Sequence, residues 1–322
     1  MSLRIVSVIG ATGQQGSAVA RALLKEGTFT PRAIARNPDS DAAKKLVAEG
    51  IAIVKGDSLD KASLVEAFRG SDAVFAFTAP IYPMSREGPN ELVQGKNIVD
   101  AAKEVGIKFV VSTGMPSISK LSGGKYTRVL HYDFKEETEE YLRASGIPNA
   151  TLYLGGFLEN LWKFGNLKKT PTGYDMAIPR FHAHEKQAFT WVDRDIPQCT
   201  LALLKAYNAG KVAEVNGRSF PVVNANIPYG ELAARIGETL GVQVTFTRLE
   251  STGMPAMDDM FDAHAEYSGL YTATPVPNPG LVALGVRLGT LEEFLEQEVK
   301  TRYGPDGPLT GKGEEPPYPR KN

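Results

Sequence analysis

The sequence contains a single cysteine, Cys199, among its 322 residues. One cysteine cannot close an internal disulfide, which excludes the class of secreted domains held together by disulfides. A long hydrophobic run is missing as well, since no apolar stretch approaches the roughly 20 residues that a membrane-spanning helix needs. The first ten residues read as a β-strand rather than as a signal peptide. We therefore expect an intracellular protein, cytoplasmic or nuclear, without a membrane partner.

An excess of charge of either sign is also missing. The chain has 36 basic and 37 acidic residues and no dense block of lysine and arginine. No direct nucleic-acid partner is expected, because nucleic-acid binding needs a basic surface. His182 and His184 alternate as two metal ligands would, but no cluster of cysteines or carboxylates accompanies them. We interpret them as part of a polar loop or an exposed strand face and predict no metal site.

The first half of the chain alternates short apolar runs with stretches of helical periodicity. The strands are predicted at residues 4–9, 31–35, 51–55, 73–77, 108–112 and 150–154. The helices are predicted at residues 14–26, 41–49, 61–69, 91–105 and 131–144. This alternation is typical of an α/β fold, a Rossmann-type doubly wound parallel sheet.

The length of the chain exceeds what a single core of this kind uses. We predict a Rossmann domain at residues 1–155, a smaller mixed α/β C-terminal lobe at 156–301, and a flexible tail at 302–322 that is rich in Gly, Pro, Lys and Glu. In the smaller lobe, residues 165–179 show only a loose pattern. Helices are predicted there near 196–207, 229–240 and 255–267, and strands at 219–223 and 242–249.

A glycine-rich turn, Gly10-Ala11-Thr12-Gly13-Gln14-Gln15-Gly16, connects the first predicted strand to the first helix. Glycines in this position let a pyrophosphate approach the unpaired N–H groups and the positive dipole end of the helix. The spacing GxxGxxG would be weak evidence alone, but its place in the first βα turn makes it strong. We assign Gly10, Thr12, Gly13, Gln14, Gln15 and Gly16 to cofactor binding.

The cofactor expected in this turn is NADP(H). Folds that prefer NAD place a carboxylate about twenty residues after the loop, where this chain has Arg36. A guanidinium suits the 2′-phosphate of NADP because it donates paired, charge-assisted hydrogen bonds. Asp57 is expected either to contact the adenine or to cap the following helix. Thr78 follows the fourth strand and is expected beneath the cofactor ribose.

The tyrosine of the Tyr-x-x-x-Lys pair found in short-chain dehydrogenases is absent. The matching run, His131-Tyr132-Asp133-Phe134-Lys135, keeps the lysine but has His131 in the tyrosine position. Tyr132 lies about 100° around the helix from that face, so it cannot simply substitute. Lys135 and His131 are the candidate catalytic residues, since imidazole can act as an acid near neutral pH, and Lys135 is also assigned to the cofactor site, where the lysine of such a pair holds the nicotinamide ribose. Ser112 is a further candidate that could orient a substrate carbonyl, or a turn former.

The chain resembles the NmrA-like family of atypical short-chain dehydrogenases and reductases over nearly its whole length up to the tail. The resemblance rests on the residue 10–16 loop, Ala35-Arg36-Asn37, Gly56-Asp57, Val111-Ser112-Thr113, His131 to Lys135 and Gly156-Phe157-Leu158-Glu159-Asn160. By this resemblance we also assign Gly155, Phe157 and Asn160 to the cofactor site.

The resemblance implies two kinds of function. Some relatives bind dinucleotides and change protein partners with little turnover, which would make this chain a redox-sensing regulator whose loops respond to NADP(H). Others are enzymes, which would make it an NADPH-dependent reductase of a quinone, enone or similar carbonyl that uses Lys135. The partner besides the dinucleotide is accordingly a regulatory protein or a small carbonyl substrate. The missing tyrosine favours the regulator.

Overall fold

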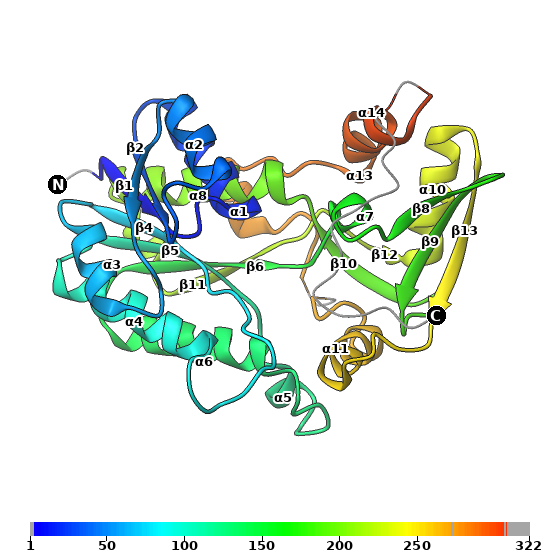
Figure 1. The fold of residues 1–322 in the computed structure, drawn as a ribbon, viewed down its shortest axis with the longest axis horizontal. Coiled ribbons are helices and arrows are strands. Elements are labelled where there is room, and N and C mark those ends of the chain that lie inside the picture. Colours follow the sequence, from blue (N-terminus) through cyan, green and yellow to red (C-terminus); the bar gives the residue numbers. More distant parts are fainter. Residues whose placement is uncertain (1–2, 272–273, 306, 308–322) are drawn as a thin grey trace.

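The computed structural model describes residues 3–271, 274–305 and 307. Two lobes lie side by side, the larger containing the N-terminal half of the chain (Figure 1). No helix in the described ranges is long and apolar enough to cross a membrane.

The larger lobe is built on a seven-stranded parallel sheet with the order β11-β6-β5-β4-β1-β2-β3. Its strands are β1 (Ile5–Val8), β2 (Thr30–Ala35), β3 (Ala52–Lys55), β4 (Ala73–Ala76), β5 (Phe109–Gly114), β6 (Asn149–Leu154) and β11 (Arg218–Val222). The strand order reverses between β1 and β4, and ligands of such sheets bind beyond the carboxyl ends of the strands at this switch point. The topology thus predicts the place of the site.

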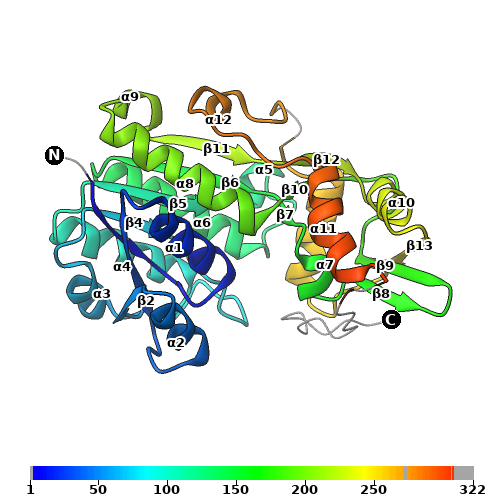
Figure 2. The same cartoon turned by 90° about the horizontal axis from the view of Figure 1, so that it is seen from above.

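Helices cover both faces of this sheet (Figures 1 and 2). One layer contains α1 (Gln14–Glu26), α2 (Asp41–Ala48) and α8 (Val192–Asn208); the other contains α3 (Lys61–Phe68), α4 (Glu91–Glu104) and α6 (Leu130–Ala144). Ser40, Asp60 and Asn90 cap α2, α3 and α4 with side-chain hydrogen bonds to backbone N–H groups. Separate apolar clusters fill the space between each layer and the sheet.

The smaller lobe has two three-stranded sheets, β12-β10-β7 and β13-β9-β8. Its strands are β7 (Gly156–Phe157), β8 (Leu167–Thr170), β9 (Gly173–Pro179), β10 (Lys186–Thr190), β12 (Ala225–Pro228) and β13 (Gln243–Leu249). Its helices are α7 (Asn160–Lys163), α10 (Tyr229–Leu240), α11 (Pro255–Glu266), α13 (Leu291–Phe294), the π-helix η1 (Leu295–Val299) and α14 (Lys300–Tyr303). The short helices α5 (Ile118–Leu121), α9 (Val212–Val215) and α12 (Pro279–Ala283) complete the connections.

The Rossmann-type sheet with an additional mixed lobe is confirmed, but the chain is divided between the lobes differently from the prediction. The strand predicted at 219–223 is β11, which pairs with β6 in the large sheet. The helix predicted at 196–207 is part of α8, which packs on α1 and contributes to the core of the larger lobe. The chain therefore enters the smaller lobe after β6, returns for α8 and β11, and leaves again.

Two further stretches differ from the prediction. Residues 165–179, which showed little pattern, form the antiparallel pair β8 and β9. Gly173 begins β9 with φ +156°, and a Cβ there would lie 2.0 Å from the carbonyl oxygen of Gln243 on β13, so the sheet requires glycine at this point. Of the predicted tail at 302–322, Arg302 and Tyr303 belong to α14, and most of the remainder lies outside the described residues.

Candidate functional site

A cleft with a volume of about 310 Å³ lies at the carboxyl ends of β1 to β4. It is lined by Ile9, Gly10, Thr12, Gly13, Ile34, Ala35, Arg36, Gly56, Asp57, Ser58, Leu59, Leu64, Phe77, Ala79, Pro80, Ile81 and Gln94. Five of the predicted cofactor residues, Gly10, Thr12, Gly13, Arg36 and Asp57, are among them. Phe77 and residues 79–81 of the segment after β4 form one side of the cleft, whereas Thr78 is not among its lining residues, so the place of Thr78 beneath a cofactor ribose stays a prediction.

The glycine-rich turn fits a pyrophosphate group. Gly10 adopts φ +58°, and the N–H of Gly13 donates to the Gly10 carbonyl at 2.9 Å. Gly13 stands at the N-cap of α1 without a side-chain cap, which leaves the first N–H groups of the helix available to an anion. A Cβ on Gly16 would lie 2.5 Å from the Gly10 carbonyl oxygen, so only glycine lets α1 approach the turn this closely.

Gln14, Gln15 and Gly16 form the first turn of α1 and are not among the residues that line the cleft. Gln15 Oε1 accepts a hydrogen bond from the Thr113 hydroxyl at 3.1 Å, which ties α1 to the end of β5. Gln14 Nε2 is buried and has no hydrogen-bond partner within the described part of the chain. A buried amide donor without an acceptor is costly, which is consistent with an acceptor supplied by a ligand.

Arg36 and Asp57 stand on the same side of the cleft, after β2 and β3. Arg36 is exposed, and no hydrogen bond or ion pair joins its guanidinium to any described residue. Asp57 Oδ1 accepts the N–H of Leu59 at 3.0 Å. The alternative that Asp57 caps the next helix is wrong, since Asp60 is the N-cap of α3 and its side chain accepts the N–H of Ser63.

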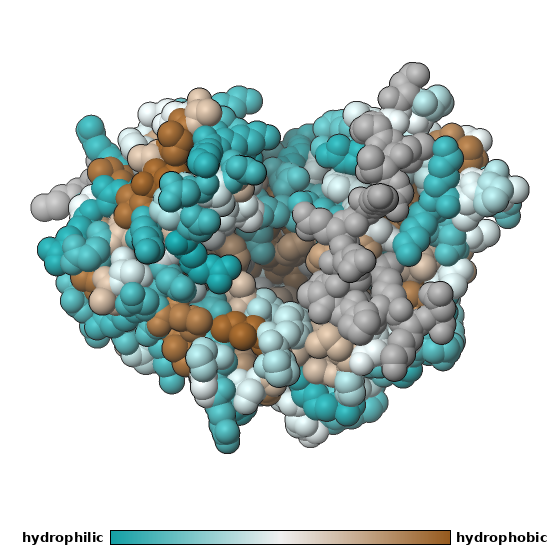
Figure 3. Space-filling model, in the orientation of Figure 1, coloured by the Kyte–Doolittle hydropathy of each residue, from teal (hydrophilic) through white to brown (hydrophobic). Residues whose placement is uncertain are grey.

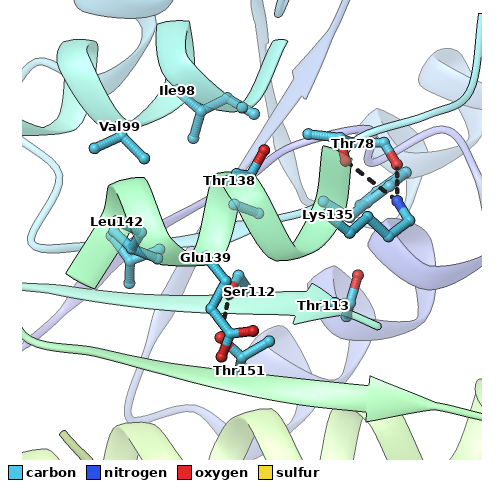
Figure 4. Close-up of a pocket in the computed structure, with 15 residues that line it drawn as sticks. Thr78, Ile98, Val99, Ser112, Thr113, Lys135, Thr138, Glu139, Leu142 and Thr151 are labelled. Atoms are coloured by element: carbon cyan, nitrogen blue, oxygen red, sulfur yellow. Dashed lines mark hydrogen bonds between the residues drawn. The ribbon is translucent and has the colours of Figure 1, made fainter. Parts of the chain in front are cut away.

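At the opposite end of the site, Lys135 on α6 points toward the segment after β4 (Figure 4). Its ammonium donates to the Thr78 carbonyl at 2.8 Å and to the Thr78 hydroxyl at 3.2 Å, and it forms an ion pair with Glu91. Ser112 lines the same small cavity of about 30 Å³ as Thr78 and Lys135. The Ser112 hydroxyl is hydrogen-bonded to the Thr151 hydroxyl at 3.0 Å. The role of Ser112 toward a substrate stays a prediction.

His131 cannot serve as the acid that its position in the motif predicts. The imidazole is 5% exposed, and its Nδ1 atom has no hydrogen-bond partner in the described ranges. Burial, together with the charge of Lys135, lowers the pKa of His131 to about 3. The ring is therefore neutral at pH 7, because the desolvated imidazolium is disfavoured. It packs edge-on against Tyr132, with ring centroids 4.8 Å apart.

Gly155, Phe157 and Asn160 lie on the segment that connects the two lobes after β6. The N–H of Gly155 donates to the Thr190 hydroxyl at 2.8 Å, Phe157 packs against the core of the larger lobe, and Asn160 begins α7. None of the three lines either cavity described above. Between the lobes the surface is hollowed, with apolar side chains at the bottom of the hollow (Figure 3). The assignment of these residues to the cofactor stays a prediction.

Sequence reasoning missed three buried polar residues near the site: Glu91 and Gln94 on α4, and Glu159 before α7. Glu91 contacts Thr78 and Lys135, and Gln94 lines the cleft. No local motif marks Glu91 or Gln94, because their partners lie far away in the sequence, and Glu159 belongs to the run of residues 156–160 but was given no role of its own. Polar residues inside otherwise apolar helical faces were the one available signal, since such residues need a buried partner.

Glu159 has a pKa that follows from its surroundings. Its carboxyl group is fully buried, Oε1 accepts the N–H of Asp193 at 2.9 Å, and Oε2 has no partner among the described residues. Burial raises the pKa to about 7 from 4.5, against the opposing effect of the backbone hydrogen bonds. Glu159 thus caps the start of α8 as a carboxylic acid below neutral pH.

This raised pKa predicts a pH dependence of stability. Between pH 4.5 and 7 the folded state holds a proton on Glu159 that the unfolded state has lost, so the free energy of unfolding falls as the pH rises. The loss is on the order of 3 kcal/mol above pH 7. We expect Glu159→Gln to match the native chain near pH 4.5 and to be more stable at pH 8, in urea unfolding at both pH values. A stability difference that is the same at both would contradict the assignment.

Comparison with known proteins places the chain in a family. The model of the NmrA-like family matches residues 3–270. An NmrA-like family domain-containing oxidoreductase of Aspergillus campestris is 30% identical over 279 residues, 80% of each chain. One of Cladobotryum is 38% identical over 162 residues, so the match covers only 48% of each.

Solved structures share the fold. NmrA, a negative transcriptional regulator, in complex with NADP, superposes with a TM-score of 0.74 at 19% identity over 94% of this chain and 97% of that one. An NADPH-dependent quinone oxidoreductase of Escherichia coli in complex with NADPH gives 0.66 at 23% identity over 90% and 98%. Both neighbours hold the cofactor predicted from the sequence. The family prediction is confirmed: this chain belongs to the NmrA-like family.

Proposed function

We propose that the chain is an NADP(H)-dependent oxidoreductase that reduces a conjugated, electron-poor carbonyl compound such as a quinone or an enone. The observation that carries the proposal is a pair of neighbouring cavities that share Phe77: the cleft lined by the glycine-rich turn and Arg36, and the small cavity lined by Thr78 and Lys135. The oxidoreductase names of its relatives support the same reading. This reverses the order of the two functions favoured from the sequence.

When bound, NADPH supplies a hydride. Residues of the chain then have to bind the cofactor, orient its nicotinamide end and provide a proton for the substrate oxygen. The Lys135 ammonium lies beside the Thr78 carbonyl, where it can orient a ribose hydroxyl that replaces one of its two hydrogen bonds to Thr78. His131 is neutral and buried, so it donates no proton at pH 7.

The absence of an acid at residue 131 limits the substrate class. A simple ketone needs a proton on its oxygen as hydride arrives, which an enzyme normally supplies from a positioned acid. A quinone or enone delocalises the developing negative charge and can take its proton from water. The site is therefore suited to conjugated acceptors.

The test is to follow NADPH absorbance with a panel of quinones, enones and simple ketones. We expect turnover of conjugated acceptors only, and Lys135→Ala to lower kcat/KM roughly tenfold, the value of one charge-assisted hydrogen bond. His131→Gln is the matched control and should change kcat/KM less than threefold. Tight NADPH binding without turnover of any acceptor would contradict the enzyme proposal.

A second candidate is a dinucleotide-responsive regulator. The supporting observation is that all three N–H bonds of Lys135 already have partners in Thr78 and Glu91, so the lysine secures the segment after β4. Cofactor binding at Lys135 would change that segment, residues 78–90, and so alter a surface for a protein partner. Hydrogen exchange with NADP⁺ and NADPH tests this. Identical protection of residues 78–90 in both states would exclude redox sensing by this route.

A further inference from the structure

Helix α4 presents a row of polar side chains to the cofactor site. Glu91, Gln94 and Asn97 follow one another at intervals of three residues, which places them along one side of the helix. Each hydrogen-bonds to a loop that follows a strand of the large sheet, rather than to solvent alone. The row thus connects α4 to the loops that follow β3 and β4.

Gln94 holds the adenosine side of the cleft. Its Oε1 accepts the N–H of Ala79 at 3.1 Å, and its Nε2 donates to the Ala79 carbonyl at 2.9 Å. The same Oε1 accepts the Ser58 hydroxyl at 3.3 Å, and Asn97 donates to the Ser58 carbonyl at 3.0 Å. Ser58 and Ala79 both line the cleft, so one amide group fixes both of its sides.

Glu91 holds the other end. The carboxylate is 1% exposed, and its Oε1 accepts the Thr78 hydroxyl at 2.7 Å and the ammonium of Lys135. Its Oε2 is buried and has no partner among the described residues. Glu91 is the carboxylate that pairs with the Lys135 ammonium, and this ion pair holds the ammonium against Thr78.

We infer that α4 positions the two halves of the dinucleotide separately: Gln94 shapes the binding surface for the adenosine half, and Glu91 orients Lys135 for the nicotinamide half. This inference rests on the proposed function only in requiring that NADP(H) binds. Both residues act through others, Gln94 through Ala79 and Ser58, and Glu91 through Lys135. They are positioning residues and take no part in hydride transfer.

The two halves can be separated with ligands. 2′,5′-ADP carries the adenosine half alone, and NADPH carries both halves. When both dissociation constants are measured by calorimetry, a variant that weakens NADPH but not 2′,5′-ADP acts on the nicotinamide half. We expect Gln94→Met to weaken both ligands about tenfold, because it leaves both polar groups of Ala79 without their partner. Glu91→Gln should weaken NADPH about tenfold and change 2′,5′-ADP less than twofold.

Lys96→Gln is the matched control, since Lys96 is an exposed residue of the same helix, and it should alter neither constant. In a Lys135→Met background, Glu91→Gln should change NADPH affinity less than twofold, because there is no ammonium left to orient. Glu91→Gln alone leaves the buried Lys135 ammonium without its carboxylate partner and could therefore fail to fold. The double variant has no ammonium at residue 135, so it can be measured even in that case.

Two outcomes overturn the inference in different ways. Equal weakening of both ligands by Glu91→Gln, or an unchanged effect in the Lys135→Met background, would mean that Glu91 only stabilises the fold, while NADP(H) binding would stand. Failure of the native chain to bind either ligand would remove the proposed function together with the inference.

Discussion

Replacing Arg36 with alanine is expected to lower the affinity for NADPH by roughly 10- to 100-fold and to leave the affinity for NADH within twofold. Arg36 lies on the cleft after β2, where it is exposed and free of interactions with the described residues. A guanidinium that is not already paired can form charge-assisted hydrogen bonds with a dianionic 2′-phosphate, each worth about 1.5–3 kcal/mol. NADH lacks this phosphate, so only NADPH loses binding energy.

Two further variants sharpen the measurement, which is calorimetric titration with both cofactors. Arg36→Asp should favour NADH over NADPH, since a carboxylate accepts from the ribose 2′-hydroxyl and repels a phosphate. Arg4→Ala removes an exposed arginine from the amino end of β1, at the opposite edge of the sheet, and should change neither affinity. Equal weakening of NADPH and NADH by Arg36→Ala would show that Arg36 contacts a part common to both cofactors.

The Rossmann half of the fold was predictable because its information is local. Most of its strands are short buried runs, as β4 is, and several of its helices have a recognisable start, such as Ser40 before α2. A glycine-rich turn between a strand and a helix is typical of phosphate binding, and in this chain only glycine at residue 16 allows the helix to lie so close to Gly10. The predicted strands and helices of residues 4–154 accordingly recur in the structure.

The assignment of elements to lobes was not predictable in the same way. The pattern of residues 218–222 indicates a strand, but its partner is β6, which pairs Arg218 with Ala150 across 67 intervening residues. Periodicity identifies a strand and its buried face without identifying its neighbours. The same applies to α8, whose apolar face would fit either lobe.

In the candidate site, too, residues that belong to a motif were predictable, and contacts between distant residues were not. Lys135 was found because it belongs to a motif, but the ion pair with Glu91, 44 residues earlier, leaves no trace in any local pattern. His131 occupies a motif position too, and its failure as an acid depends on burial by surrounding elements. A motif indicates which residue type stands where, whereas protonation depends on the packing around it.

The largest effects on the cofactor site itself are expected from its glycines. A methyl group on Gly16 would lie 2.5 Å from the Gly10 carbonyl oxygen and 2.8 Å from the Ala11 Cα. Both are backbone atoms, so α1 must move away from the turn. We expect Gly16→Ala to abolish measurable NADPH binding and to destabilise the fold by about 1–3 kcal/mol, the usual cost of overpacking.

Gly13→Ala separates the cofactor effect from the folding effect. Its methyl group would meet only the Gly10 carbonyl oxygen, at 3.3 Å, so the turn needs to yield by a few tenths of an ångström. The same methyl group would stand where a pyrophosphate approaches the N-terminus of α1. We therefore expect a melting temperature within a few degrees of the native chain and NADPH affinity reduced at least tenfold, because the charge-assisted N–H contacts are lengthened.

Gly27→Ala provides the stability-matched control. Gly27 ends α1 with φ +82°, and a Cβ there would meet no atom within 4 Å, so the substitution costs about 1–2 kcal/mol through backbone strain alone. It should lower the melting temperature by an amount comparable to Gly16→Ala while leaving NADPH affinity unchanged. If Gly27→Ala weakened NADPH as much as Gly13→Ala does, the glycine effects would arise from general destabilisation, and the turn at residues 10–16 would not be the phosphate-binding element.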